Sequence, residues 1–323
     1  ERLGGIADRF LIHNRPILRH MDDSIARIIM GRELILRRAR GYAPLPVYLQ
    51  HPLPPLLAVG GQMKNTVAVS AGNKVFLSQH IGDLGSTQSF HTFTKTIESF
   101  ARLYDQPPAG QIAILCDAHP DYVSTRFANE MGPRCFPVQH HYAHVLSCMA
   151  ENDLLENGRP TPVLGVAWDG SGYGDDATLW GGEFLRIADS GFQRVAHLRP
   201  FHLPGGELAI KEPRRSALGL LYEAFGESAF TMNELAPIKS FSPIELDVLK
   251  TSLKNKINSP ATSSIGRLFD AVAGILGLIQ QSSFEGQAAM SLEFALLDFP
   301  SDQLYNFKLT ETNGPIIIDW EPL

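Results

Sequence analysis

Two apolar runs that flank a glycine-rich bend constrain the fold of this chain more than any other feature. Residues 163–169 have the composition of a buried strand, and residues 177–184 have that of a second strand which returns beside it. The bend between them contains Gly170, Gly172 and Gly174. Glycine lets a backbone approach a ligand closely, so the N–H groups of the bend can face phosphate oxygens. Asp169 ends the first strand, where its carboxylate could hold Mg²⁺.

A similar arrangement occurs earlier in the chain. Residues 56–70 predict a strand, a turn at Gly60 and Gly61, and a second strand, with Lys64 just after the turn. A plain β-hairpin is the alternative interpretation of this segment. Neither bend has the GxGxxG or the GxxxxGK[ST] spacing, which excludes the Rossmann and P-loop motifs. What remains is a phosphate-binding hairpin used twice, which is typical of the two-lobed α/β fold of actin, Hsp70 and the sugar kinases.

Three of the eleven histidines lie within five residues, at His140, His141 and His144. A predicted strand precedes them and a predicted helix follows, so the histidines open a helix. Residues four apart lie on one helix face, so His140 and His144 can present two imidazoles to one metal ion while His141 points elsewhere. The zinc-protease motif HExxH would need Glu where His141 stands, so protease chemistry is not expected. Capping or partly buried histidines are the alternative interpretation.

Other polar residues stand at or near the starts of predicted helices. Gly266 and Asp270 lie in the first turns of a helix predicted for residues 263–277, where the positive helix end and a carboxylate could meet a ribose or a phosphate. Glu285 begins another predicted helix, and Arg214 belongs to a compact charged element that could clamp a phosphate. Taken alone, the two helix starts favour a structural role, and a solvated loop is the alternative interpretation of the element that contains Arg214.

The composition is that of a globular chain, with 323 residues of which 44% are hydrophobic and 19% charged. A net charge of −6 without a basic tract argues against binding to nucleic acid. The longest apolar stretch, residues 268–279, is interrupted by Asp270 and is shorter than the ~18 residues of a membrane span, so no membrane attachment is expected. The three cysteines suggest neither a zinc finger nor a disulfide framework and favour a cytoplasmic setting.

Five prolines within residues 42–55 predict an extended connector. Residues 1–48 are then the tail of one domain, and residues 49–323 belong to a larger unit. The chain begins without methionine and ends where a strand is expected to give way to the next element. We therefore expect it to be a fragment at both ends.

Taken together, these segments resemble the HypF carbamoyltransferase family of [NiFe]-hydrogenase maturation over essentially the entire chain. Residues 1–48 resemble the end of the family's YrdC-like domain. From about residue 56 the chain resembles its actin-like domain, which is related to the transferase that places threonylcarbamoyl on tRNA. The motifs that match in order begin at Gly60, His140, Asp169, Trp180, Gly266 and Glu285.

The resemblance implies a fold of two α/β halves, the first at about residues 56–160 and the second from about residue 161, with one Zn²⁺ or Fe ion held by His140 and His144. ATP or carbamoyl-adenylate with Mg²⁺ would lie between the halves. By the same resemblance, its contacts would be Gly60, Gly61, Asp169, Gly170, Gly172, Gly174, Gly266, Asp270 and Glu285. The catalytic residues would be Lys64, His141 and Arg214.

The family's reaction, as the resemblance implies it, takes carbamoyl phosphate and ATP through carbamoyl-adenylate to the C-terminal cysteine of the partner protein HypE. The resulting thiocarbamate is the precursor of a cyanide ligand of the hydrogenase. An aspartate that completes the family's metal site is expected beyond Leu323, so the fragment should bind metal weakly and be inactive alone.

Three alternatives share the same superfold. An O-carbamoyltransferase of small molecules would carry its YrdC-like domain after the actin-like one, whereas here the YrdC-like tail comes first. The tRNA-modifying enzyme would have no such tail. The third is a non-catalytic nucleotide-binding module. In that case, replacing His140 and His144 in the full-length protein would leave carbamoyl transfer unchanged.

Overall fold

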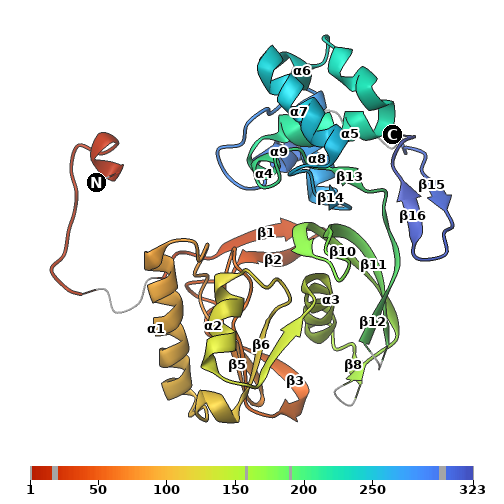
Figure 1. The fold of residues 1–323 in the computed structure, drawn as a ribbon. Helices are drawn as coiled ribbons and strands as arrows, with labels where there is room; N and C mark the ends of the chain where they lie inside the picture. Colours follow the sequence, from red (N-terminus) through yellow and green to blue (C-terminus); the bar gives the residue numbers. More distant parts are fainter. Residues whose placement is uncertain (1, 17–20, 157–158, 189–190, 298–302, 323) are drawn as a thin grey trace.

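The computed structural model describes residues 2–16, 21–156, 159–188, 191–297 and 303–322. Its body consists of two lobes, each built on a β-sheet (Figure 1). Helix α3 (His140–Glu151) leads from the first lobe to the second. The short elements outside the two main sheets and the helices are the hairpin of β1 (Ile25–Ile29) and β2 (Arg32–Arg37), the pair β8 (Leu155–Glu156) and β9 (Arg159–Pro160), and the 3-10 turns Arg2–Gly5, Ala109–Gln111 and Gly226–Thr231.

The first lobe is a five-stranded sheet with the strand order β3-β5-β4-β6-β7. β4 pairs antiparallel with β5 and parallel with β6, and β6 pairs parallel with β7. Phe93, Ile114 and Ala128 lie in the apolar core between this sheet and its helices. The elements of the lobe are β3 (Pro46–Leu53), β4 (Leu56–Ala58), β5 (Ala68–Leu77), α1 (Thr87–Leu103), β6 (Ala113–Asp117), α2 (Val123–Met131) and β7 (Cys135–Val138).

The second lobe contains a seven-stranded sheet in which β11 pairs with β10, β12 and β14. The pairing of β11 with β10 and β12 is antiparallel, so the lobe begins with a three-stranded meander. The strands are β10 (Val163–Tyr173), β11 (Leu179–Ala188), β12 (Gly191–Leu198), β13 (Phe201–His202), β14 (Ala261–Thr262), β15 (Lys308–Thr310) and β16 (Ile316–Asp319).

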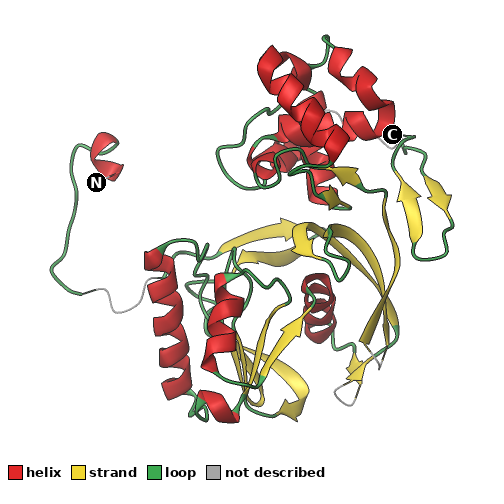
Figure 2. Cartoon of the chain, viewed as in Figure 1, coloured by secondary structure: helices red, strands yellow, loops and turns green. Residues whose placement is uncertain are grey.

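The helices of the second lobe gather at one end of its sheet (Figure 2). α5 and α8 pack closely, with Ala217 and Leu268 in a shared buried core. None of the helices in the described part of the chain is long and apolar enough to cross a bilayer. The helices are α4 (Leu208–Lys211), α5 (Pro213–Phe225), α6 (Ala236–Lys239), α7 (Pro243–Asn255), α8 (Ile265–Ile275) and α9 (Gln287–Leu297).

Both strand–bend–strand segments predicted from the sequence are present, but the second differs in detail. β10 continues through the predicted bend to Tyr173, and its pairing with β11 shifts register between Trp168 and Gly172. The bend is therefore a bulge inside β10, and the chain reverses direction only at residues 174–178. Glycine is needed there for packing: a Cβ at Gly174 would lie 2.1 Å from the Trp180 ring.

The predicted connector at residues 42–55 is extended, but it is not a free linker. Its residues Pro46–Leu53 form β3, which pairs with β5 at the edge of the first lobe's sheet. The preceding β1–β2 hairpin reaches the second lobe, because Arg27 forms an ion pair with Glu293 of α9 at 2.6 Å. The assignment of residues 1–48 to a YrdC-like domain stays a prediction.

Helix α3 packs tightly against β10 and β11. Val145 and Met149 on α3 share a buried cluster with Ala167 and Leu185 of those strands. A Cβ at Gly165 of β10 would lie 2.5 Å from Cγ1 of Val145. The absence of a side chain at Gly165 therefore sets how closely the histidine helix approaches the second lobe.

We expect Gly165→Ala to lower the free energy of unfolding by about 1–3 kcal/mol, because overpacking a filled site forces α3 and β10 apart. Urea denaturation followed by circular dichroism measures this change. Gly110→Ala is the matched control, since a Cβ there meets nothing within 4 Å. Equal stability of the two variants would show that α3 does not rest on β10 as described.

Candidate metal centre

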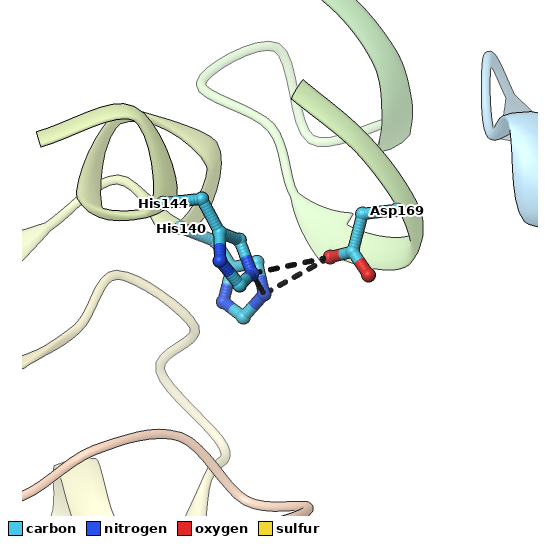
Figure 3. A group of neighbouring side chains, drawn as sticks. All are labelled: His140, His144 and Asp169. Carbon is cyan, nitrogen blue, oxygen red and sulfur yellow. Dashed lines mark hydrogen bonds and ion pairs between the residues drawn. The ribbon is translucent and has the colours of Figure 1, made fainter. Parts of the chain in front are cut away.

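The histidine pair stands on the first turns of α3, whose N-cap is Gln139. The Gln139 side chain accepts a hydrogen bond from the backbone N–H of Tyr142, which fixes the start of the helix at His140. His140 and His144 project from one helix face, as the four-residue spacing predicted, and their Nε2 atoms are 3.2 Å apart. The two rings point toward the same place in Figure 3.

Asp169 on β10 faces the two imidazoles (Figure 3). Its Oδ2 atom lies 3.1 Å from His140 Nε2 and 3.7 Å from His144 Nε2. A tetrahedral ion 2.0–2.1 Å from each ligand separates the ligand atoms by roughly 3.3 Å, which these distances match. Asp169 Oδ2 is also buried and has no hydrogen bond of normal geometry within the described residues. Together the three side chains fit a divalent cation that accepts imidazole and carboxylate.

The position of Asp169 differs from what the sequence suggested. The sequence interpretation placed Asp169 at a phosphate loop with Mg²⁺ and nominated no aspartate of this chain for the metal site. In the structure its carboxylate points at the histidine pair, since β10 runs beside α3 at this point. Asp169 and the histidines are separated by more than twenty residues, so sequence spacing gave no sign of the contact.

Asp117, at the end of β6, is the functional residue that the sequence interpretation missed. Its side chain is 5% exposed, and its Oδ2 atom lies 2.7 Å from Nδ1 of His140. A carboxylate at this position makes Nδ1 the protonated nitrogen and leaves Nε2 free to bind a cation. The available signal was topological: β6 and β7 are neighbours, and β7 leads directly into His140.

The two carboxylates also determine the charge of His140. Burial lowers its pKa, but the contacts with the carboxylates of Asp117 and Asp169 outweigh this effect and raise the pKa to about 9. Burial acts in the opposite direction on Asp169 and raises the pKa of its carboxyl group. The pairing of Asp169 with His140 and His144 outweighs burial and holds this pKa below its usual range. Without a metal, His140 is therefore protonated at neutral pH, and a cation would replace the proton on Nε2, which faces Asp169.

His141, predicted to be catalytic, is completely buried. Oε1 of Gln139 accepts a hydrogen bond from the Tyr142 N–H, so the other side-chain atom, Nε2 of Gln139, is a donor. This Nε2 atom lies 3.1 Å from Nδ1 of His141, which therefore accepts. The proton of His141 is then on Nε2, which faces Asp169 Oδ2 at 3.8 Å. Burial lowers the pKa of His141 to about 4, so the ring is neutral. The geometry places His141 behind Asp169, out of reach of a substrate, which corrects its assignment as a catalytic residue.

The first turn of α8 closes against the glycine bulge. Ser264 caps the helix, and its Oγ lies 2.8 Å and 2.6 Å from the carbonyl oxygens of Asp169 and Gly170. A Cβ at Gly266 would lie 2.8 Å from the Cα of Gly170, so a side chain there is excluded. Close packing therefore accounts for Gly266, and its predicted contact with a nucleotide stays a prediction.

Gly172 has a similar role against α3. A Cβ at this position would lie 2.6 Å from Cε1 of His141 and 2.8 Å from Cδ2 of His140. The bulge therefore needs glycine so that the histidine helix can approach it. Contacts of Gly170, Gly172 and Gly174 with phosphate stay predictions.

Arg267, beside the predicted Asp270, is a second residue that the sequence interpretation did not single out. The two form an ion pair of 3.0 Å within the first turns of α8, and both are almost fully buried. Nε and Nη1 of Arg267 have no hydrogen-bond partner among the residues that the structure describes. Burial raises the pKa of Asp270 to about 6, against the opposing effect of Arg267. Nη2 of the same guanidinium is the atom next to the bulge, since a Cβ at Gly170 would lie 3.7 Å from it.

The glycine turn of the first lobe lies next to the same centre. Gly60 adopts a φ of +70°, where a Cβ would lie 2.5 Å from the carbonyl oxygen of Thr66. A Cβ at Gly61 would be 3.7 Å from Oδ2 of Asp117. Lys64, just beyond the turn, forms an ion pair of 2.9 Å with Glu285 of the second lobe. Two predicted site residues from opposite lobes are thus in contact.

Arg214 is not placed as predicted. It is buried on α5, where it forms ion pairs with Glu212 at 2.9 Å and Glu245 at 3.4 Å and donates to the carbonyl of Ser240 at 2.6 Å. Its guanidinium also lies over the ring of Phe241. These contacts make Arg214 part of the helical packing of the second lobe, so it is not free to clamp a phosphate.

The fold and the site define a two-lobed, actin-like α/β protein with a His–His–Asp group between its lobes. Residues 51–151 match the family model described as the HypF Kae1-like domain, and residues 165–323 match the one described as "Carbamoyltransferase, Kae1-like Domain, second subdomain". The chain belongs to the HypF carbamoyltransferase family. This confirms the predicted family and the predicted actin-like fold class.

Individual relatives agree with the family models. "Carbamoyltransferase HypF" of Synechocystis sp. is 44% identical over all of this chain, and "Probable carbamoyltransferase HypF" of Methanocaldococcus jannaschii is 36% identical over 94% of it. A crystal structure of full-length HypF in the phosphate- and nucleotide-bound form superposes on 99% of the chain, with a TM-score of 0.88 and 39% identity. The chain spans 43%, 39% and 40% of the lengths of these three proteins.

The pKa of His140 predicts how stability depends on pH in the metal-free chain. A histidine whose pKa rises from 6.5 to about 9 on folding stabilises the folded state fully below pH 6.5, and this contribution is lost as the pH rises through about 9. We expect the free energy of unfolding, measured by urea denaturation with a chelator present, to decrease over this interval. Asp117→Asn should flatten the decrease, and an unchanged slope in that variant would contradict the assigned contact.

Proposed function

We propose that this chain carries the carbamoyl-transferring site of a HypF protein, and that it is part of an enzyme. The observation that supports this most directly is the agreement of His140, His144 and Asp169 with the ligand separations of a tetrahedral metal site. The chain covers less than half of the length of the relatives described above, so the activity of the whole protein comes to it only as part of this proposal.

The proposed reaction uses carbamoyl phosphate and ATP with Mg²⁺ and passes through carbamoyl-adenylate. The carbamoyl group is then transferred to the C-terminal cysteine of HypE, as the precursor of the cyanide ligand of [NiFe]-hydrogenase. We place this reaction in the cytoplasm. Its support is the family membership and the metal-site geometry, together with two glycine turns from opposite lobes that approach the same centre.

In this proposal, one set of residues would hold the metal ion and a second set would bind the nucleotide. Zn²⁺ or Fe²⁺ in the site would act as a Lewis acid toward a carbamoyl or phosphate oxygen. Asp117 orients His140, so that Nε2 faces the ion and Nδ1 keeps its proton. The Arg267 guanidinium has its Nη2 atom beside Gly170, where its positive charge can compensate the negative charge of a phosphate.

Glu285 and Lys64 form the other part of the proposed nucleotide site. Their ion pair joins the lobes at positions that are 43% and 69% exposed, so it is weak and can exchange for contacts to a ligand. Asp270, at the first turns of α8, would complete the nucleotide contacts together with Gly60 and Gly61.

Replacing both histidines tests the metal site. We expect His140→Ala/His144→Ala to remove the binding of about one Zn²⁺ ion per chain, because two of three ligands are lost. Calorimetric titration and metal analysis measure this. His91→Ala is the control, because His91 is an exposed histidine on α1. Zinc binding that persists in the double variant would place the metal elsewhere.

The same substitutions test the enzymatic proposal in the full-length protein. With HypE, carbamoyl phosphate and ATP supplied, mass spectrometry should show carbamoylated HypE for the wild type and for His91→Ala, and none for His140→Ala/His144→Ala. Unchanged transfer by the double variant would favour a nucleotide-binding module without a catalytic role for the histidines.

A further inference from the structure

Two of the three cysteines meet in the first lobe, although they are nineteen residues apart. Cys116 on β6 and Cys135 on β7 have their Sγ atoms 3.3 Å apart. β6 and β7 are parallel neighbours, and Ile114 pairs with Cys135 in their register. Residues two apart on a strand share a face, so both thiols project from the same side of the sheet.

The two thiols differ in their access to solvent. Cys116 is 5% exposed within the apolar core of the lobe, whereas Cys135 is only partly buried at its edge. Burial and the contact with Cys135 raise the pKa of Cys116 to about 12, so Cys116 stays a thiol at neutral pH. Cys135 is then the thiol that a dissolved oxidant meets first.

Each cysteine is linked along the chain to the metal centre. Cys116 directly precedes Asp117, and the strand that begins at Cys135 ends two residues before His140. The 2.7 Å contact between Asp117 Oδ2 and His140 Nδ1 therefore joins the ends of the same two strands. A change in the spacing of β6 and β7 must displace one partner of this contact relative to the other.

We propose that Cys116 and Cys135 form a reversible disulfide that disturbs the Asp117–His140 contact and so weakens metal binding. The proposal rests on the metal site of the proposed function. A disulfide bond is about 2.05 Å long, so the two sulfurs must approach each other by roughly 1.3 Å from their present separation. The loss of a carboxylate partner of a metal-bound histidine typically weakens metal affinity 10- to 100-fold.

The co-reactant is a low-molecular-weight disulfide such as oxidised glutathione. The Cys135 thiolate attacks one of its sulfurs, which releases one glutathione thiolate and leaves a mixed disulfide. Cys116 gives its proton to water and attacks the Cys135 sulfur, which releases the second glutathione. Two protein thiols are thus oxidised to one disulfide while one glutathione disulfide is reduced to two thiols.

The first experiment follows the thiols in a Cys148→Ser background, which leaves only this pair of cysteines. After treatment with oxidised glutathione, we expect both free thiols to disappear and the mass to fall by the two thiol hydrogens, with reversal by dithiothreitol. A Cys116→Ser/Cys148→Ser protein should instead retain one glutathione. Stable glutathione on the protein that has both cysteines, or thiols that stay free, would overturn the proposal.

The second experiment measures the coupling in the same protein by two independent readouts. We expect oxidation to weaken zinc binding about 10-fold and to shift the ring ¹⁵N resonances of His140, which report its hydrogen bond to Asp117. The resonances are recorded without metal, so they test the coupling even if the reduced protein does not bind zinc. Failure of the reduced protein to bind zinc would contradict the metal site itself. Unchanged His140 resonances in protein with a verified disulfide would overturn the coupling.

Discussion

The hydrogen bond between Asp117 and His140 is the interaction on which the arrangement of the centre depends. It joins the end of β6 to the start of α3, and it determines which nitrogen of His140 is available to a cation. Because Nδ1 donates to Asp117, Nε2 faces His144 and Asp169 at ligand-like distances. The close packing of α3 on Gly165 and Gly172 then brings this helix near enough to β10 for Asp169 to complete the group.

Close packing and side-chain hydrogen bonds to the backbone hold the first turn of α8 against this centre. Ser264 and Gly266 bring the first turn of α8 onto the glycine bulge of β10, where the carbonyl groups of Asp169 and Gly170 have a hydroxyl partner. The contact between Lys64 and Glu285, by contrast, is an exposed ion pair and contributes little to stability. The side of the site made by β10 and α8 is thus closely packed, whereas the ion pair of Lys64 with Glu285 is weak enough for a ligand to replace.

The sequence predicted local features well and contacts between distant segments poorly. The histidine helix, the two glycine hairpins and helix α8 follow from short-range periodicity and composition, and all are present. Asp117 and the metal-facing position of Asp169 could not be predicted in this way, because they depend on which strands are neighbours in the sheets. Arg214 was misassigned since its charge suggested a ligand, whereas burial beside Glu212 and Phe241 gives it a structural role. The complete burial of His141 was not predicted, because partly buried histidines were only the alternative interpretation.

X-ray absorption at the zinc edge of the zinc-loaded chain tests the central claim most directly. If His140, His144 and Asp169 bind the ion, the spectrum will show two imidazole nitrogens at about 2.0–2.1 Å with oxygen as the remaining ligand, and His144→Ala will remove one imidazole. Sulfur scatterers at about 2.3 Å, or a spectrum without imidazole, would place the metal on other residues and contradict the account.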